Sequence, residues 1–421
     1  KVAYIGEFAE KPRYQGGGSS HINPFRVVSA LDAAGEKGRS VTYAKGFSNE
    51  NDSMTEQELE KALRTAAEAD VAVIFAGLPE IFESEGYDRT SMKLPQCQDR
   101  LIEEVLKVQP NVVVVLHNGS PVELPWADKV SAILEMYLGG QGVGEACDRL
   151  LFGEANPSGR LSETFPYRLE DNPSYLHFPG NGKRVLYGED IFVGYRYYDT
   201  KKVPVRYAFG HGLSYTEFTY GDLTLSSAQM TDEDILTVSF KVKNTGKTEG
   251  KEVVQLYVAD LCGISERPVK ELKGFAKVHL LPGEEKTVSM EISARNLSYY
   301  EERLGDWYAP SGTYRILIGH ASDDIRLHAD VVFETKKKLP LRVDFTTTFG
   351  ELLDHTKTAP VITELLAPLA AAAASAEGMS DEYKKLGEQV IREMPLKSLL
   401  GQMPGEQVEQ LIGQLNCLLA Q

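Results

Sequence analysis

Residues 1–165 alternate short, continuous apolar runs with longer segments in which apolar residues recur every three or four positions. The continuous runs, which predict strands, are residues 2–5, 41–44, 71–77, 112–116 and 132–138. The periodic segments, which predict helices, are residues 24–34, 55–69, 95–108 and 144–152. Strands that are apolar throughout are buried on both faces, and their alternation with helices is typical of a parallel sheet. We therefore expect a doubly wound α/β sandwich, with a mainly parallel sheet, in residues 1–165.

Two of these helices carry specific start signals. Asn23 and Pro24 suit the cap and the first position of a helix over residues 24–34. Thr55, followed by Glu58, forms a capping box for the next helix.

The pattern changes after residue 165. Residues 166–216 have no sustained period and are rich in Gly, Pro, Tyr and Asp, which predicts a long inter-domain segment. Apolar and polar positions then alternate through residues 217–335, with a turn at 244–246. The strands are expected at 236–242, 253–258, 286–292, 312–318 and 327–333. This spacing is typical of an all-β fibronectin type III-like sandwich, and its single Cys262 excludes the immunoglobulin disulfide. We expect it to support its neighbour.

Residues 336–421 return to helical spacing and predict a small helical tail. A helix is expected to start at 348–353, residues 365–376 are Ala-rich, and 381–394 and 406–419 have apolar residues every three or four positions. Pro395 lies between these last two segments and breaks the helical pattern. A tail of this kind is more typical of a docking surface than of a site.

Composition narrows the function further. The net charge is −16, so we expect neither nucleic acid nor membrane as a partner, since both favour basic surfaces. The four cysteines form no CxxC pair and no Cys/His cluster, which predicts no disulfide framework, no metal site and a reducing, cytoplasmic location. No apolar run reaches the length of about 18 residues that a membrane span needs. Lys1 begins directly in a strand, as in a chain cut from a longer one.

The densest candidate chemistry follows the strand at 71–77. Within ten residues the chain places four acids, Glu80, Glu83, Glu85 and Asp88, and one guanidinium, Arg89. A loop after a parallel strand lies at the carboxyl edge of the sheet, where open α/β folds bind their ligands. Crowded carboxylates raise one another's pKa, which keeps an acid protonated near neutral pH. The alternative is a solvated acidic loop without chemistry.

A glycine-rich loop, residues 11–21, follows the first strand and should reach the same edge. It contains Gly16-Gly17-Gly18-Ser19-Ser20 but lacks the Lys-Ser/Thr of a phosphate-binding P-loop. Residues 140–144 likewise lack the spacing of a dinucleotide site. A nucleotide-dependent enzyme is therefore the weakest interpretation, and a plain flexible turn stays open for the glycine loop. His117, at a strand end, is interpreted as a packing residue. Trp126, Trp307 and Tyr308 are candidate sugar-stacking platforms only in a weak sense, and Trp307 is expected in the core of the sandwich.

Three motifs resemble glycoside hydrolase family 3, the β-glucosidase family. They are Glu83-Ser-Glu-Gly-Tyr-Asp-Arg89 with Leu94-Pro95-x-x-Gln98-x-x-Leu101-Ile102, then Ala208-Phe-Gly-His-Gly-Leu-Ser-Tyr215, and Lys270-Glu-Leu-Lys-Gly-Phe275. The match runs over about residues 1–335, and some members also share the Met-Pro-Leu step of the tail. The resemblance implies that residues 195–199 and 210–212 form a packing belt between domains.

The resemblance also implies roles for single residues. Glu85 is the expected general acid/base, with Glu83 in reserve. Arg13, Ser19, Ser20 and Tyr87 are expected to contact substrate, and Asp88 and Arg89 to form an ion pair that holds the loop. No cofactor is expected.

A retaining glycosidase needs a second carboxyl group, and the family takes this nucleophile, an Asp, from a (β/α)₈ barrel. No eightfold pattern is present, and such a barrel takes about 250 residues. We therefore expect part of a retaining β-glucosidase-like enzyme whose partners are that barrel and an oligosaccharide or aryl or alkyl β-glycoside, with homo-oligomerisation left open. The alternative is a non-catalytic carbohydrate-binding or scaffold module.

Overall fold

The computed structural model describes residues 1–263, 266–374 and 380–420. The chain divides into two compact units, Lys1–Tyr299 with Ala309–Thr335, and Tyr300–Tyr308 with Lys336–Gln421. The first unit contains a parallel α/β domain and an all-β sandwich, and the second contains a hairpin and a helical tail. The predicted fold class is confirmed.

The α/β domain is built on a five-stranded sheet with the order β2-β1-β3-β4-β5, in which all neighbours are parallel. The strands are β1 (Val2–Ile5), β2 (Val41–Ala44), β3 (Val71–Gly77), β4 (Val112–His117) and β5 (Ala132–Glu135). Strand β3 is buried along all but its first residue, as a continuous apolar run requires. Each Val, Leu or Ile side chain fully removed from water here stabilises the fold by about 1.5–3 kcal/mol.

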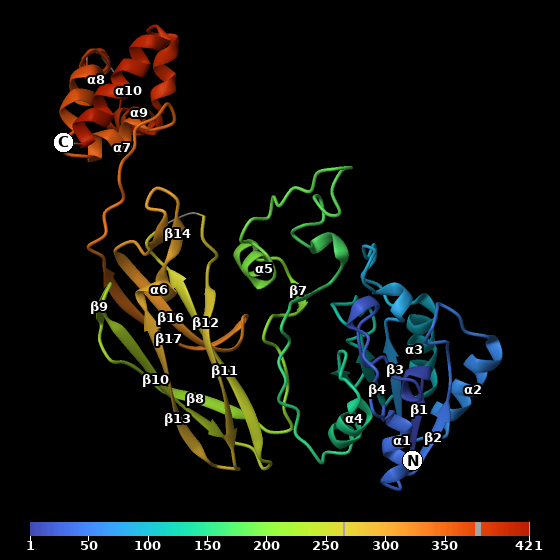
Figure 1. Ribbon diagram of the computed structural model, residues 1–421. Coiled ribbons are helices and arrows are strands. Elements are labelled where there is room, and N and C mark those ends of the chain that lie inside the picture. Colours follow the sequence, from blue (N-terminus) through green and yellow to red (C-terminus); the bar gives the residue numbers. More distant parts are fainter. Residues whose placement is uncertain (264–265, 375–379, 421) are drawn as a thin grey trace. The chain divides into compact units, whose positions relative to one another are not determined.

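Helices cover both faces of this sheet (Figure 1). They are α1 (Ala30–Glu36), α2 (Glu56–Ala67), α3 (Gln96–Val108) and α4 (Val143–Leu151). Helix α1 packs beside α4, and α2 packs beside α3. The capping box predicted for the second helix is present, because the Thr55 side chain accepts from the Glu58 backbone and Glu58 accepts from the Thr55 backbone.

Two sequence-based boundaries are wrong. The helix expected from Pro24 begins at Ala30, where Ser29 and Asp32 form a capping box. Contact with α4 keeps the preceding backbone extended, since Gly144 N donates to Val28 O at 3.1 Å. The strand expected over 132–138 ends at Glu135, whose carboxylate accepts from Tyr137 N, and Tyr137 turns the chain with a φ of 49°.

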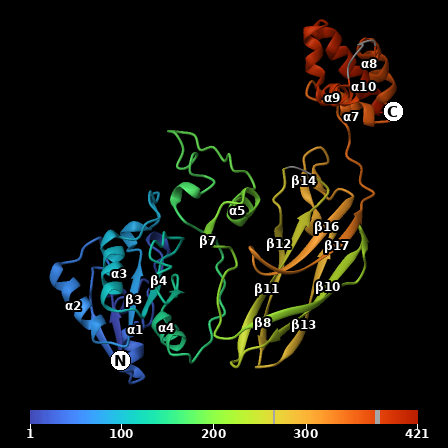
Figure 2. The ribbon, with the colours of Figure 1, turned by 180° about the vertical axis from the view of Figure 1, so that it is seen from behind.

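The segment after the α/β domain contains little regular structure (Figure 2). Its elements are β6 (Phe165–Pro166), α5 (Tyr195–Lys201) and β7 (Val205–Tyr207). Helix α5 packs on the sandwich, because the Tyr195 hydroxyl accepts from Leu272 N at 2.7 Å and Asp199 pairs with Lys270 at 2.8 Å. The motifs around Tyr195 and Lys270 therefore bind each other, in agreement with a packing role.

The sandwich has a sheet with the order β13-β10-β8 and one with the order β12-β11-β16-β17-β9. Its strands are β8 (Phe218–Leu225), β9 (Gln229–Thr231), β10 (Ile235–Asn244), β11 (Gly250–Asp260), β12 (Glu271–Leu280), β13 (Glu285–Ser293), β16 (Gly312–Ala321) and β17 (Asp324–Glu334), with helix α6 (Ala294–Leu297) after β13. Alternate side chains of β10 are buried in a core shared by the two sheets, as the period of two predicts.

The second unit combines a hairpin with the tail. Its strands are β14 (Tyr299–Glu301) and β15 (Asp306–Tyr308), and its helices are α7 (Phe349–Asp354), α8 (Ala359–Ala374), α9 (Asp381–Glu393) and α10 (Gly405–Ala420). The helices share their own apolar core. The last two positions of the Ala-rich stretch, 375–376, lie outside the described residues. No helix in the described ranges is long and apolar enough to cross a membrane.

Candidate functional site

The strand order places a crevice between β1 and β3. The chain leaves β1 towards β2 on one side and leaves β3 towards β4 on the other. Loops that depart in opposite directions open a crevice at the carboxyl ends of the two strands, which is where doubly wound sheets bind ligands. The loops that meet here are the glycine loop after β1 and the acidic loop after β3, the two candidates that the sequence singled out.

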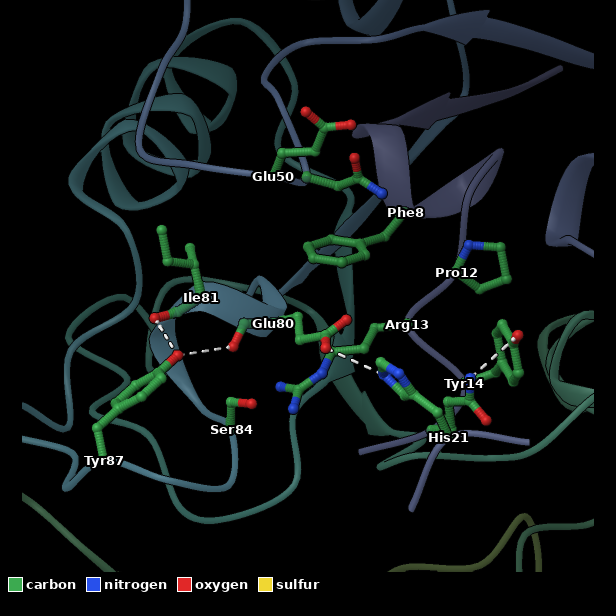
Figure 3. Close-up of a pocket in the computed structure, with 12 residues that line it drawn as sticks. Phe8, Pro12, Arg13, Tyr14, His21, Glu50, Glu80, Ile81, Ser84 and Tyr87 are labelled. Carbon is green, nitrogen blue, oxygen red and sulfur yellow. Dashed lines mark hydrogen bonds and ion pairs between the residues drawn. The ribbon is translucent and has the colours of Figure 1, made fainter. Parts of the chain in front are cut away.

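A cavity of about 630 Å³ lies between these loops. Figure 3 shows side chains that line it from the segments after β1, β2 and β3. The lining residues are Phe8, Pro12, Arg13, Tyr14, Gln15, His21, Asn49, Glu50, Glu80, Ile81, Ser84 and Tyr87. They combine aromatic faces with carboxylate and amide groups, a combination that suits a polar ligand with apolar faces.

Two contacts shape the rim of this cavity. The imidazole of His21 lies 3.0 Å from the Glu80 carboxylate, which joins the glycine loop to the acidic loop. The Tyr87 hydroxyl donates to Ile81 O at 2.6 Å, with Glu80 O at 3.2 Å. Tyr87 therefore lines the cavity with half of its surface exposed, and its contact with substrate stays a prediction.

The glycine loop is packed against the acidic loop. A Cβ atom on Gly17 would lie 2.3 Å from the Ser84 hydroxyl oxygen, and one on Gly18 would lie 2.5 Å from the Glu85 Cβ. Glycine is therefore required by the close approach of the two loops, so the loop is more than a flexible turn. Ser19 and Ser20 follow in a short 3₁₀ helix and are exposed at the same edge.

The two glutamates of the acidic loop differ sharply in environment. Both oxygens of Glu83 are occupied: Oε2 accepts from Arg13 Nη1 and from Gly119 N, each at 2.7 Å, and Oε1 accepts from the Ser120 hydroxyl. Burial alone raises the pKa of Glu83, but the hydrogen bonds from Ser120 and Gly119 and the charge of Arg13 outweigh burial and hold it below its ordinary value. Glu83 is therefore a fixed carboxylate.

Glu85 is exposed and has no hydrogen bond or ion pair with any residue in the described ranges. Its side chain lies against Gly18, beside the cavity rather than in its lining. Of the two glutamates, only Glu85 is available to a ligand.

Arg13 and Arg89 have structural partners. The Arg13 guanidinium donates to Leu78 O at 3.0 Å, to Glu83 O at 2.8 Å and to the Glu83 carboxylate, and only 8% of the residue is exposed. Arg13 therefore makes a buried contact with the acidic loop while it also lines the cavity, and its contact with substrate stays a prediction. Arg89 donates to Ser120 Oγ at 2.7 Å and lies 3.7 Å from Glu83, so it holds the loop without the expected pairing to Asp88, which is exposed.

Sequence reasoning missed a second carboxyl group behind this loop. Glu135, at the end of β5, accepts from Tyr137 N at 2.8 Å and from Asn118 Nδ2 at 3.2 Å. Burial raises the pKa of Glu135 to about 8 and also raises that of Glu163. The only feature of the sequence that could have identified Glu135 is its position as an acidic residue at the end of an apolar strand.

The remaining candidates are packing residues or lie elsewhere. His117 is stacked against the rings of Phe8 and Phe75, and burial lowers its pKa to about 4. Trp126 is fully buried and donates to Asp99 at 2.8 Å. Trp307 belongs to the second unit and is 39% exposed, so the expectation that it lies in the sandwich core is wrong. Among the described residues, no three His, Cys, Asp or Glu side chains are grouped to hold a metal ion.

Comparison with known proteins places these features in a family. Residues 1–215 match the glycosyl hydrolase family 3 C-terminal domain, and residues 252–322 match the fibronectin type III-like domain. The chain is 47% identical to the thermostable β-glucosidase B of Acetivibrio thermocellus, in an alignment that covers 99% of this chain and 56% of that protein. It is 40% identical to an exo-α-(1→6)-L-arabinopyranosidase of Bifidobacterium breve, in an alignment that covers the whole of this chain and 54% of that protein. The chain thus spans about half the length of the curated relatives it matches.

Solved structures agree with the fold. The family 3 β-glucosidase of Bifidobacterium adolescentis aligns with a TM-score of 0.80 and 40% identity, covering 86% of this chain and 53% of that one. The β-glucosidase of Kluyveromyces marxianus, in complex with glucose, aligns with a TM-score of 0.73 and 28% identity over 79% of this chain and 58% of that one.

Proposed function

The chain belongs to glycoside hydrolase family 3, and from that premise we propose that it supplies the general acid/base of a retaining β-glucosidase-like enzyme. The residue that performs this step is Glu85. The nucleophile, an Asp in this family, lies on a (β/α)₈ barrel outside these 421 residues. The substrate is a terminal β-linked sugar on an oligosaccharide or on an aryl or alkyl group.

The observation that carries the proposal is the difference between Glu85 and Glu83. An acid/base must reach the glycosidic oxygen of a bound substrate and then a water molecule, so its carboxyl group has to be free of permanent partners. Glu85 is exposed and unpaired within the described residues, whereas both oxygens of Glu83 accept hydrogen bonds from the protein.

The reaction then follows two steps. Glu85 first donates its proton to the oxygen of the leaving group while the barrel aspartate attacks the anomeric carbon and forms a glycosyl ester. Glu85, now a carboxylate, accepts a proton from the water that cleaves this ester, and the sugar leaves with retained configuration. The cavity beside Glu85, with Tyr87 on its rim, supports the proposal because it offers room for the departing group.

The test uses this chain alone and mixed with a family 3 barrel domain, with an aryl β-glucoside as substrate. We expect activity only in the mixture. Glu85→Ala should lower it about 10²–10⁴-fold, and azide should restore part of the activity with a glycosyl azide as product. Asp88→Ala, which removes an exposed carboxylate of the same loop, is the matched control and should stay active.

Two outcomes would contradict the proposal. Hydrolysis by the chain alone would place a nucleophile within these residues and overturn the division of labour. A mixture that binds saccharide but hydrolyses nothing would favour the carbohydrate-binding module instead.

A further inference from the structure

Glu83 connects the loops that follow three neighbouring strands of the sheet. It lies in the loop after β3, and its carboxylate accepts from Arg13 of the loop after β1 and from Gly119 and Ser120 of the loop after β4. Arg13 Nη2 also donates to the backbone oxygen of Glu83, at 2.8 Å. Side chain and main chain of this one residue are thus fixed together.

The surroundings of Glu83 are built for this contact. A Cβ atom on residue 119 would lie 2.9 Å from Glu83 Oε2, so the approach of the carboxylate requires glycine there. The side chains of the ion pair with Arg13 are only 7% and 17% exposed. Arg89, from the same loop, adds a second guanidinium at 3.7 Å.

This arrangement excludes Glu83 itself as the proton donor. A general acid must carry a proton when the substrate binds, whereas two guanidinium groups, one N–H and one hydroxyl stabilise Glu83 as an anion. The lowered pKa of Glu83 agrees with this conclusion. Glu83 therefore acts as an anchor, that is, a fixed carboxylate that holds its loop in place and donates no proton.

We propose that Glu83 is a positioning residue that fixes the loop carrying Glu85, through the buried contacts of its carboxylate with Arg13, Gly119 and Ser120. The inference rests on the proposed acid/base role of Glu85. Only Ser84 separates the two glutamates, and Ser84 itself packs against Gly17. A displacement of about 1 Å at a reacting group can cost about 100-fold in rate, so release of the anchor should act on catalysis without removing any group that touches substrate.

The first arm of the test needs no activity. Hydrogen–deuterium exchange is measured on the backbone amides of residues 80–90 in this chain, in Glu83→Gln, in Glu83→Ala and in the control Asp88→Asn. Glutamine keeps the volume of Glu83 but removes the negative charge that pairs with the Arg13 and Arg89 guanidinium groups. We expect at least tenfold faster exchange in both Glu83 variants and unchanged exchange in Asp88→Asn. Unchanged exchange in a folded Glu83→Gln or Glu83→Ala chain would overturn the proposal.

The second arm separates an anchor from an acid/base. In the mixture with a barrel domain, Glu83→Ala should lower kcat about 10–100-fold and yield no glycosyl azide when azide is added, whereas Glu85→Ala should yield it. A glycosyl azide from Glu83→Ala would make Glu83 the acid/base and overturn the anchor, while the proposed function would stand with another residue. If the mixture hydrolyses nothing, the proposed function fails, and the exchange experiment still decides whether Glu83 fixes the loop.

Discussion

Gly18 and Glu85 are in direct contact, so closely that a Cβ atom on Gly18 would lie 2.5 Å from the Glu85 Cβ and 2.7 Å from its Oε2. The glycine loop therefore forms one wall against the proposed acid/base. Gly18 has a φ of 82°, which L side chains rarely adopt, so glycine is required there for two independent reasons.

Gly18→Ala should destabilise the protein and displace Glu85. The left-handed backbone alone costs about 1–2 kcal/mol for alanine, and the clash with Glu85 adds to it. Gly38→Ala is the matched control, because Gly38 has a φ of 65° and a Cβ atom there would meet no other atom within 4 Å. Urea unfolding of both variants, with amide exchange over residues 80–90, checks the prediction. Equal losses of stability in the two variants, with an unmoved acidic loop, would contradict it.

Arg13→Lys should loosen the same loop although it keeps the charge. The guanidinium donates to three acceptors, Leu78 O, Glu83 O and the Glu83 carboxylate, and an ammonium group cannot match that planar fork. Each lost bond to a charged partner costs about 1.5–3 kcal/mol. Arg100→Lys, at an exposed contact with Glu56, should leave the free energy of unfolding nearly unchanged. If Arg13→Lys proved as stable as Arg100→Lys in urea unfolding, one point charge would suffice to hold the loop.

The sequence predicted most of the elements and the meeting of the two candidate loops at one edge of the sheet, whereas the preference for Glu85 over Glu83 came only from the family resemblance. Continuous apolar runs imply two covered faces, and the loops after β1 and β3 meet because parallel strands end at one edge. Nothing local distinguishes Glu83 from Glu85. The difference arises from Gly119 and Ser120, which lie 36 and 37 positions away.

Long-range contacts also decide two features that the sequence did not predict. The buried acceptors of Arg13 lie 65 and 70 positions along the chain. The helix expected from Pro24 has suitable local signals, but contact of Val28 with Gly144 holds the backbone extended until Ser29. In each case a long-range contact decides between locally acceptable conformations.

Asp99 should make stability fall as the pH rises between about 4 and 6. Burial raises its pKa to about 6, against the opposing hydrogen bond from Trp126, while the unfolded value is about 3.9. The folded state thus binds the Asp99 proton more tightly than the unfolded state. The resulting contribution to the free energy of unfolding is complete below the unfolded pKa and is lost as the pH rises through the folded pKa. It amounts to about 1.4 kcal/mol for each unit of difference between the two pKa values. Asp99→Asn should flatten this slope in urea titrations at several pH values; a slope that persists in the variant would exclude Asp99 as its source.

Arg160 should be among the most costly side chains to remove, because its partner cannot return to water. Glu252 of the sandwich is fully buried, and its carboxylate lies 2.8 Å from Arg160 Nη2, 2.7 Å from His320 Nδ1 and 2.8 Å from the Tyr220 hydroxyl. Removal of one member of a buried ion pair leaves an uncompensated charge, which costs about 3–5 kcal/mol. Arg160→Met should therefore lower the free energy of unfolding by that amount.

The control for Arg160 is another arginine–carboxylate pair of the sandwich. Arg315 contacts Asp330 at 2.7 Å across two strands, but the two side chains are 40% and 42% exposed. Water solvates Asp330 whether or not the arginine is present, so Arg315→Met should leave urea unfolding almost unchanged. If Arg160→Met and Arg315→Met proved equally mild, the Glu252 carboxylate would have to be stabilised by His320 and Tyr220 alone. In that case Arg160→Met/His320→Gln, compared with each single variant, should show a loss well beyond the sum, because only then would the buried carboxylate lose both of its nitrogen partners.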